Sequence, residues 1–193
     1  MKRVLLFITH LGAQSDTLYE ILNANPRIQM ATTHTIYRTP MDAVQLTTTD
    51  HKLRTTAAIY GDRVLYNHTF CCDQLCKHCK FVYLIRAAKP TLSALLATGD
   101  YTPTSALRYY QFRLRRIMEM GKRTPGAVLL THDGVEKEGL GLIEEYLNLK
   151  TPLQGKSLPQ EELEEVPSEV VEIAQDSYER YLYQLKNMDL LVL

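Results

Sequence analysis

Short apolar segments without polar alternation recur along the chain, separated by longer stretches with helical periodicity. The clearest are residues 3–9, Lys80 to Arg86 and Ala127 to Thr131. Strands that are apolar on both faces are typical of a parallel sheet, whose strands need helical crossover connections. The pattern therefore predicts an α/β fold in three layers, a parallel sheet flanked by helices. A chain of 193 residues suits a single domain, residues 1–193.

Local signals place the remaining elements. Additional strands are expected at residues 27–32 and at Arg63 to Asn67. Thr17 and Glu20 have capping-box spacing, which favours a helix that begins at Thr17. The expected helices are residues 17–24, 90–98, 103–120, 136–148 and 168–187. In a sheet of this kind, ligands bind at the carboxyl ends of the strands.

The charge balance narrows the choice of partners and location. The chain carries 22 Lys and Arg and 22 Asp and Glu, so its formal net charge is zero. Such a chain has no overall attraction to nucleic acid or to a membrane surface. The apolar run Val4 to Ile8 is too short for a signal-peptide core, and no stretch is long enough to span a membrane. We therefore expect a cytoplasmic protein that partners neither nucleic acid nor membrane.

The charges are nevertheless segregated along the chain. Residues 101–123 contain six basic side chains and one acidic one, whereas residues 161–180 contain eight acidic side chains and one basic one. The segments are either two solvated helix faces, which could lie against each other, or the basic segment forms one wall of an anion site. The helix expected at 103–120 also offers apolar and aromatic surface for a homodimer, through Tyr109, Tyr110 and Phe112.

A turn that contains glycine joins the first strand to the first helix. Its backbone N–H groups could cradle an anion at the start of the helix, with the hydroxyls of Ser15 and Thr17 as further donors. An ordinary connection, in which Asp16 or Thr17 caps the helix, is the alternative. The strict phosphate-loop pattern and its basic residue are absent. The candidate anion-binding residues are Gly12, Ala13, Gln14, Ser15, Asp16 and Thr17.

Further polar side chains follow other strands. His68 lies just past a strand end, where an imidazole can act as a general base; a surface or hydrogen-bonded histidine is the alternative. Arg86 ends the clearest strand, and its forked guanidinium suits phosphate, although an exposed arginine or an ion pair with Asp133 would also account for it. Ser93 follows in the next expected helix, where solvent exposure is the alternative. His132 and Asp133 either touch a ligand or form a turn.

The cysteines allow two interpretations. Cys72, Cys76 and Cys79 have C-x3-C-x2-C spacing, which could hold a metal ion or an iron–sulfur cluster. On a helix, however, these residues share one stripe with Cys71 and Leu75, as small apolar core residues would. Too few residues follow Cys79 for the barrel of a radical enzyme, so we expect no metal.

The order of these parts resembles the sulfotransferase family, enzymes that use 3′-phosphoadenosine-5′-phosphosulfate (PAPS). The loop Gly12 to Thr17 is similar to the family's GAQ[KR]SGTT loop, and Tyr66 to His68 is similar to its K-T-H triplet. Phe81 to Arg86 resembles the strand whose final arginine binds the 3′-phosphate. Residues 22–28 and 128–149 are similar to other family segments, so the resemblance spans nearly the whole chain.

The resemblance implies a P-loop-type fold with PAPS as co-substrate. Gly12 to Thr17 would then hold the 5′-phosphosulfate, and Arg86 with Ser93 would hold the 3′-phosphate. His68 would deprotonate the hydroxyl or amine of a small-molecule acceptor, with His34 as the reserve base.

The chain departs from the family at the phosphosulfate loop. The loop's basic residue is missing, Asp16 stands where the family has glycine, and Tyr66 replaces the lysine of the triplet. Because a cation stabilises charge on the leaving oxygen, losing one costs ~100-fold or more in rate. Lys89, Lys156 or the segment 108–123 could replace it. Two functions stay open: sulfuryl transfer from PAPS, or a catalytically inactive fold that binds a nucleotide or a partner protein.

Overall fold

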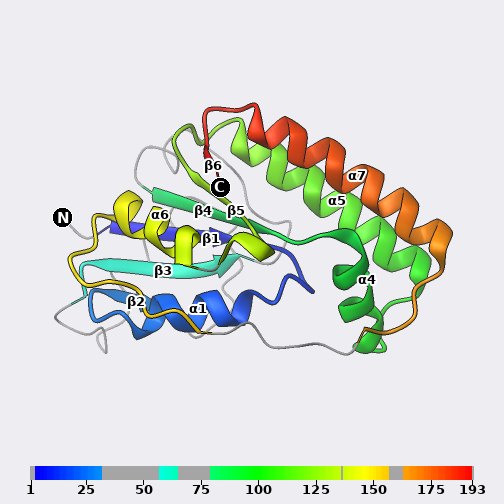
Figure 1. The fold of residues 1–193 in the computed structure, drawn as a ribbon, viewed down its shortest axis with the longest axis horizontal. Helices are drawn as coiled ribbons and strands as arrows, with labels where there is room; N and C mark the ends of the chain where they lie inside the picture. The colour runs from blue at the N-terminus through cyan, green and yellow to red at the C-terminus, as the bar shows by residue number, and fades with distance from the viewer. Residues whose placement is uncertain (1–2, 32–56, 65–78, 136, 157–162, 193) are drawn as a thin grey trace.

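A computed structural model describes residues 3–31, 57–64, 79–135, 137–156 and 163–192. Its centre is a six-stranded sheet in the order β2-β3-β1-β4-β5-β6, in which every neighbouring pair is parallel (Figure 1). The strands are β1 (Arg3–Ile8), β2 (Ile28–Met30), β3 (Ile59–Val64), β4 (Cys79–Ile85), β5 (Val128–Thr131) and β6 (Leu191–Val192). The predicted parallel α/β sheet is therefore confirmed.

Among the described residues, five α-helices cover the two faces of the sheet. They are α1 (Ser15–Ala24), α4 (Ala88–Ala97), α5 (Pro103–Gly121), α6 (Lys137–Leu147) and α7 (Ser168–Lys186), and a short 3-10 helix, η1 (His132–Val135), follows β5. Leu5 and Phe7 of β1 pack in a core with α1 and α6, whereas Leu6 and Ile8 pack with α4, α5 and α7. Because successive side chains of a strand point to opposite faces, this pattern gives the three predicted layers.

Two of the element boundaries that differ from the prediction bear on the candidate site. β3 begins at Ile59, before the expected strand at 63–67. The sequence pattern missed this beginning because Gly61, Asp62 and Arg63 interrupt the apolar run. α1 begins at Ser15, and its N-cap residue Gln14 has left-handed backbone angles (φ 51°, ψ 38°) without a side-chain capping bond. The alternative of an ordinary connection capped by Asp16 or Thr17 is therefore not observed, because both residues lie inside α1.

α5 reaches the carboxyl edge of the sheet, where Arg113 binds backbone carbonyls after β1 and at the end of β3. Thr102 and Ser105 form a reciprocal capping box at its start, and Pro103 occupies its first turn. Its inner face buries Tyr110 and Arg113 completely. Tyr110 therefore belongs to the core and not to an outer dimer surface, whereas Phe112 is 50% exposed.

Some sequence expectations concern residues outside the described part of the chain, among them His34, His68 and Cys71, Cys72 and Cys76. Cys79 is described: it starts β4 and is half-buried, so the predicted helical stripe does not extend to it. Within the described residues, no helix is long and apolar enough to cross a membrane.

Candidate functional site

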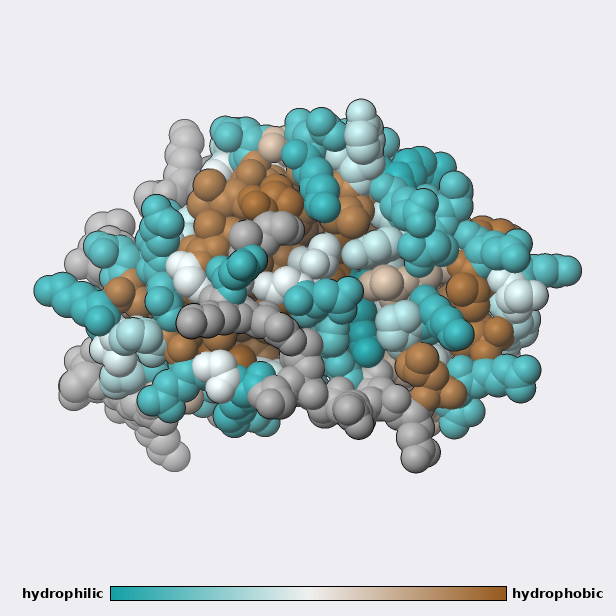
Figure 2. Space-filling view, in the orientation of Figure 1, coloured by the Kyte–Doolittle hydropathy of each residue, from teal (hydrophilic) through white to brown (hydrophobic). Residues whose placement is uncertain are grey.

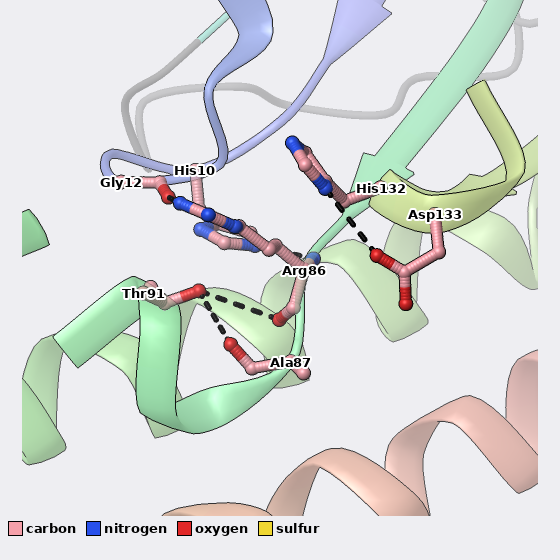
Figure 3. Close-up of polar contacts among 7 residues, drawn as sticks. All are labelled: His10, Gly12, Arg86, Ala87, Thr91, His132 and Asp133. Atoms are coloured by element: carbon pink, nitrogen blue, oxygen red, sulfur yellow. Dashed lines mark hydrogen bonds and ion pairs between the residues drawn. The ribbon is translucent and has the colours of Figure 1, made fainter. Parts of the chain in front are cut away.

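Three strand ends meet at the carboxyl edge of the sheet. The loop after β1 lies against Arg86, which follows β4, and His132, which follows β5, lies beside them (Figure 3). Nη1 of Arg86 donates to the carbonyl oxygen of Gly12 at 3.0 Å, and the Arg86 backbone N–H donates to Nε2 of His10, also at 3.0 Å. The predicted convergence of these three segments is therefore observed. The fourth, which includes His68, lies outside the described residues.

The loop after β1 is a tight turn whose shape depends on glycine. Gly12 has a φ of 77°, in the region that favours glycine. A Cβ at Gly12 would also lie 2.8 Å from the carbonyl oxygen of Thr91 in α4. The Ala13 N–H donates to the His10 carbonyl at 3.2 Å. Glycine is thus required for the turn and for packing against α4, independently of any ligand.

The first turn of α1 supplies backbone donors at this edge. The N–H groups of a first helical turn have no partner within the helix, and the side chain of the N-cap residue, Gln14, makes no capping hydrogen bond. Ser15 is buried at 4% exposure, whereas the side chain of Asp16 is 77% exposed. The helix dipole and these donors favour an anion here. The carboxylate of Asp16 already supplies one negative charge at the same position.

Arg63 of β3 is the cation that the sequence analysis missed. Its Nη1 donates to Oγ of Ser15 at 3.1 Å and to Oδ1 of Asp16 at 2.5 Å. Only 12% of the side chain is exposed, and the guanidinium carbon lies 5.2 Å from the centre of the Tyr19 ring. Nε of Arg63 is buried and has no hydrogen-bond partner among the described residues. A positive charge therefore stands beside the loop whose own basic residue is missing.

Arg86 is fixed at its backbone as well as at its side chain. The hydroxyl of Tyr110 donates to the Arg86 carbonyl at 2.6 Å, and Oγ1 of Thr91 lies 3.4 Å from the same oxygen. Burial raises the pKa of Tyr110, so this hydroxyl stays protonated and remains a donor. Arg86 itself is 7% exposed. Its guanidinium is therefore held at the loop rather than free in solvent, as the exposed-arginine alternative required.

His10 is a neutral residue in this network. Its Nδ1 lies 2.9 Å from the Leu11 carbonyl, while Nε2 accepts the Arg86 N–H. A ring that donates through Nδ1 and accepts through Nε2 is an uncharged imidazole. The pKa of His10 is lowered to about 4, chiefly by complete burial and in addition by the nearby Arg113 and Arg86 guanidinium groups, although the hydrogen bond to the Leu11 carbonyl acts in the opposite direction.

Arg113 of α5 binds the ends of two strands. Its Nε and Nη2 donate to the Thr9 carbonyl at 2.8 and 2.6 Å, and Nη2 also donates to the Val64 carbonyl at 2.7 Å. Burial lowers the pKa of Arg113 to about 10, so the group is still charged at neutral pH. Nearby, the Leu11 N–H donates to the Tyr109 hydroxyl at 2.8 Å. The basic segment therefore stabilises the carboxyl edge of the sheet through hydrogen bonds to the backbone of the strand ends.

The other predicted site residues are placed less favourably for binding a ligand at this edge. Ser93 is 1% exposed within α4, so its hydroxyl faces the protein interior instead of solvent. Nζ of Lys156 pairs with Oε2 of Glu20 at 2.8 Å, on the outer side of α1. Nδ1 of His132 lies 3.5 Å from Oδ1 of Asp133, in η1. Of these, His132 is the one drawn beside Arg86 in Figure 3.

Compared with models of known protein families and with curated proteins, the chain matches none. The binding properties of the site must therefore be argued from its own side chains and backbone groups. Among the described residues, no three His, Cys, Asp or Glu side chains lie close enough to hold a metal ion. The donors that the edge does present, backbone N–H groups and two guanidinium groups, are those of an anion site.

Proposed function

We propose that the chain is a divergent P-loop-type sulfotransferase that binds PAPS at the loop between β1 and α1. The observation that carries the proposal is the position of two guanidinium groups, Arg63 and Arg86, on loop atoms. PAPS carries a phosphosulfate and a separate phosphate, so a site for it needs cationic donors at two places. The donor set therefore fits the co-substrate that the sequence resemblance implies.

Each part of the co-substrate has a matching group. The N–H groups of the first α1 turn and Arg63 would hold the 5′-phosphosulfate, and Arg63 would take the place of the missing loop base. Arg86 would hold the 3′-phosphate; the buried Ser93 would contribute less than the resemblance implies. His68 would remove the proton from the hydroxyl or amine of a small-molecule acceptor, which then attacks sulfur. The bond between sulfur and the bridging oxygen breaks, and 3′-phosphoadenosine-5′-phosphate leaves.

A second function is supported by the pair between Arg63 and Asp16. The carboxylate neutralises the guanidinium, so the loop presents less positive charge than a transfer enzyme requires at the leaving oxygen. Losing such stabilisation costs ~100-fold or more in rate. In this alternative the fold binds the nucleotide without transferring its sulfuryl group, and acts as a nucleotide- or protein-binding module.

Calorimetric titration with the desulfonated product, 3′-phosphoadenosine-5′-phosphate, tests both functions at low salt. We expect micromolar binding, weakened about 10-fold or more by Arg86→Ala and by Arg63→Gln, because each loses a charged hydrogen bond. Lys150→Ala, an exposed change beyond α6, is the matched control and should bind like the original protein. Thermal melts establish that each variant is folded.

Transfer is then measured with PAPS and a panel of phenols, alcohols and amines. Sulfated product that disappears in His68→Ala supports the enzyme. Binding without product supports the binding module. No binding by the folded original protein contradicts sulfuryl transfer and nucleotide binding, and leaves the protein-binding module.

A further inference from the structure

α5 and α7 lie side by side and run in the same direction (Figure 1). Nε2 of Gln111 in α5 donates to Oγ of Ser177 in α7 at 2.8 Å. Ten residues further along α5, a Cβ at Gly121 would lie 2.9 Å from a methyl group of Leu185. Both pairs of positions advance together, so the two helices are parallel. Residues that precede Ser177 in α7 therefore lie level with the first half of α5.

The outward side of α5 is basic. Its exposed positions recur at three- and four-residue steps and run opposite to the buried residues of the helix. Five exposed side chains on it or just beyond it are basic: Arg108, Arg115, Arg116, Lys122 and Arg123. Glu119 is the acidic one, and it pairs with Arg115 and Arg116 within the same helix. Those ion pairs therefore do not join α5 to α7.

The outward side of α7 is acidic over its first half. Residues 163–180 expose six acidic side chains and one basic one, which is Arg180. The acidic ones are Glu164, Glu165, Glu169, Glu172, Asp176 and Glu179. Most of these acidic residues precede Ser177, whereas the basic residues Arg115 to Arg123 follow Gln111. One end of the helix pair is therefore acidic and the other end is basic. We call this surface the α5/α7 face.

Apolar side chains stand among these charges. Phe112 in α5 is 50% exposed, and Ile173 and Tyr183 in α7 are 51% and 71% exposed. Figure 2 shows mostly hydrophilic side chains where Figure 1 places α7 and α5. Helix dipoles account for acids at the start of α7 and bases at the end of α5. They do not account for Arg108 and Arg115 in the body of α5, or for the outward apolar groups.

We propose that the α5/α7 face binds a second copy of the chain, related by a twofold axis. A twofold interface brings one surface onto itself, so it must be self-complementary. A face with an acidic end and a basic end satisfies this requirement when the two copies cross in opposite directions. The acidic end of each copy then contacts the basic end of the other, and the apolar groups near the middle meet across the axis.

The size of the face suits a weak, salt-sensitive dimer. Each helix has 19 residues, which makes it about 28 Å long, and two helices about 10 Å wide give roughly 550 Å² per copy. The total of about 1,100 Å² is at the low end of specific interfaces. Exposed charges are screened by salt, so association should weaken as ionic strength rises.

Sedimentation velocity at about 50 mM salt and about 50 µM protein tests the proposal. We expect a dimer that dissociates at about 500 mM salt. Arg115→Glu/Lys122→Glu, at the basic end of the face, should be monomeric because acidic groups would then face acidic groups. Glu172→Arg/Asp176→Arg should be monomeric for the opposite reason. An equimolar mixture of the two variants should dimerise again, since each altered helix face meets a complementary one.

Lys150→Glu, on the other side of the sheet, should leave the dimer intact and serves as the control for a change in net charge. Three results would overturn the proposal: a monomer under all conditions, a dimer that neither charge reversal affects, or failure of the two folded variants to associate when mixed. None of these measurements involves a nucleotide, so they are independent of the function proposed above.

Discussion

His10 should make the protein lose stability as the pH falls below neutrality. In the folded chain the ring is fully buried and accepts a hydrogen bond from the Arg86 N–H. Protonation would place an N–H on the nitrogen that now accepts, and would bury a positive charge near Arg113 and Arg86. The folded protein therefore resists protonation, whereas the unfolded chain does not.

The magnitude follows from the two pKa values of His10. The pKa is 6.5 for an ordinary histidine and about 4 in the folded protein. Between these values the unfolded chain binds the proton and the folded one does not, so stability is fully present above pH 6.5 and falls as the pH drops toward 4. A separation of about 2.5 pH units corresponds to about 3 kcal/mol. For a domain with roughly 5–15 kcal/mol of stability, this loss is large.

Urea denaturation at several pH values between 7 and 4 measures the effect. His10→Gln is the matched control, because its amide oxygen can still accept the Arg86 N–H but does not titrate. Both proteins share their carboxylates and remaining histidines, so the difference between their stability curves isolates His10. We expect the original protein to lose about 3 kcal/mol more than the variant across this range.

Parallel stability curves for the two proteins would refute the reasoning. So would an NMR titration in which the ring protons of His10 report an ordinary pKa near 6.5 in the folded protein. Either result would mean that the ring is hydrated or that it does not accept from Arg86.

Two further sets of substitutions test a packing contact and a buried hydrogen bond that position the site. Gly61→Ala places a Cβ against the buried sulfur of Met30, so we expect a loss of about 1–3 kcal/mol in urea denaturation. Met30→Ala should cost about 2–5 kcal/mol alone, and the double variant should lose less than the sum; strict additivity would contradict the contact. Tyr110→Phe removes the hydroxyl that donates to Arg86, with an expected loss of about 1–2 kcal/mol. Tyr183→Phe, at a 71% exposed position, should change stability by less than about 0.5 kcal/mol, and equal losses in the two tyrosine variants would contradict the buried hydrogen bond.

The parallel sheet could be predicted because its signal is local. Leu5 and Leu6 are both buried although they point to opposite faces, and the apolar composition of the strand alone requires this. β3 was placed too late because its burial depends on distant neighbours. Gly61 makes room for Met30 in the adjacent strand. The pattern of apolar residues along the chain cannot predict that contact.

The site could be predicted only where topology brings residues together. The carboxyl ends of parallel strands share one edge, and this rule placed Arg86 beside the loop of Gly12. The same rule gives no reason for Arg113 to bind Thr9, which lies 104 residues away. That contact depends on the rotation of α5 about its axis, which the packing of the whole helix layer decides.

The loop after β1 illustrates how a motif that is incomplete in sequence can be completed in space. Between Gly12 and Thr17 the chain has no base and one acid, which by itself argues against an anion site. Yet Arg63, 47 residues from Asp16, reaches that loop from the neighbouring strand. A charge at this edge is therefore a property of the sheet and not of the loop. Whether the loop attracts an anion is decided by the balance between the guanidinium groups of Arg63 and Arg86 and the carboxylate of Asp16, and by the N–H groups of the first α1 turn, which the Gln14 side chain does not cap.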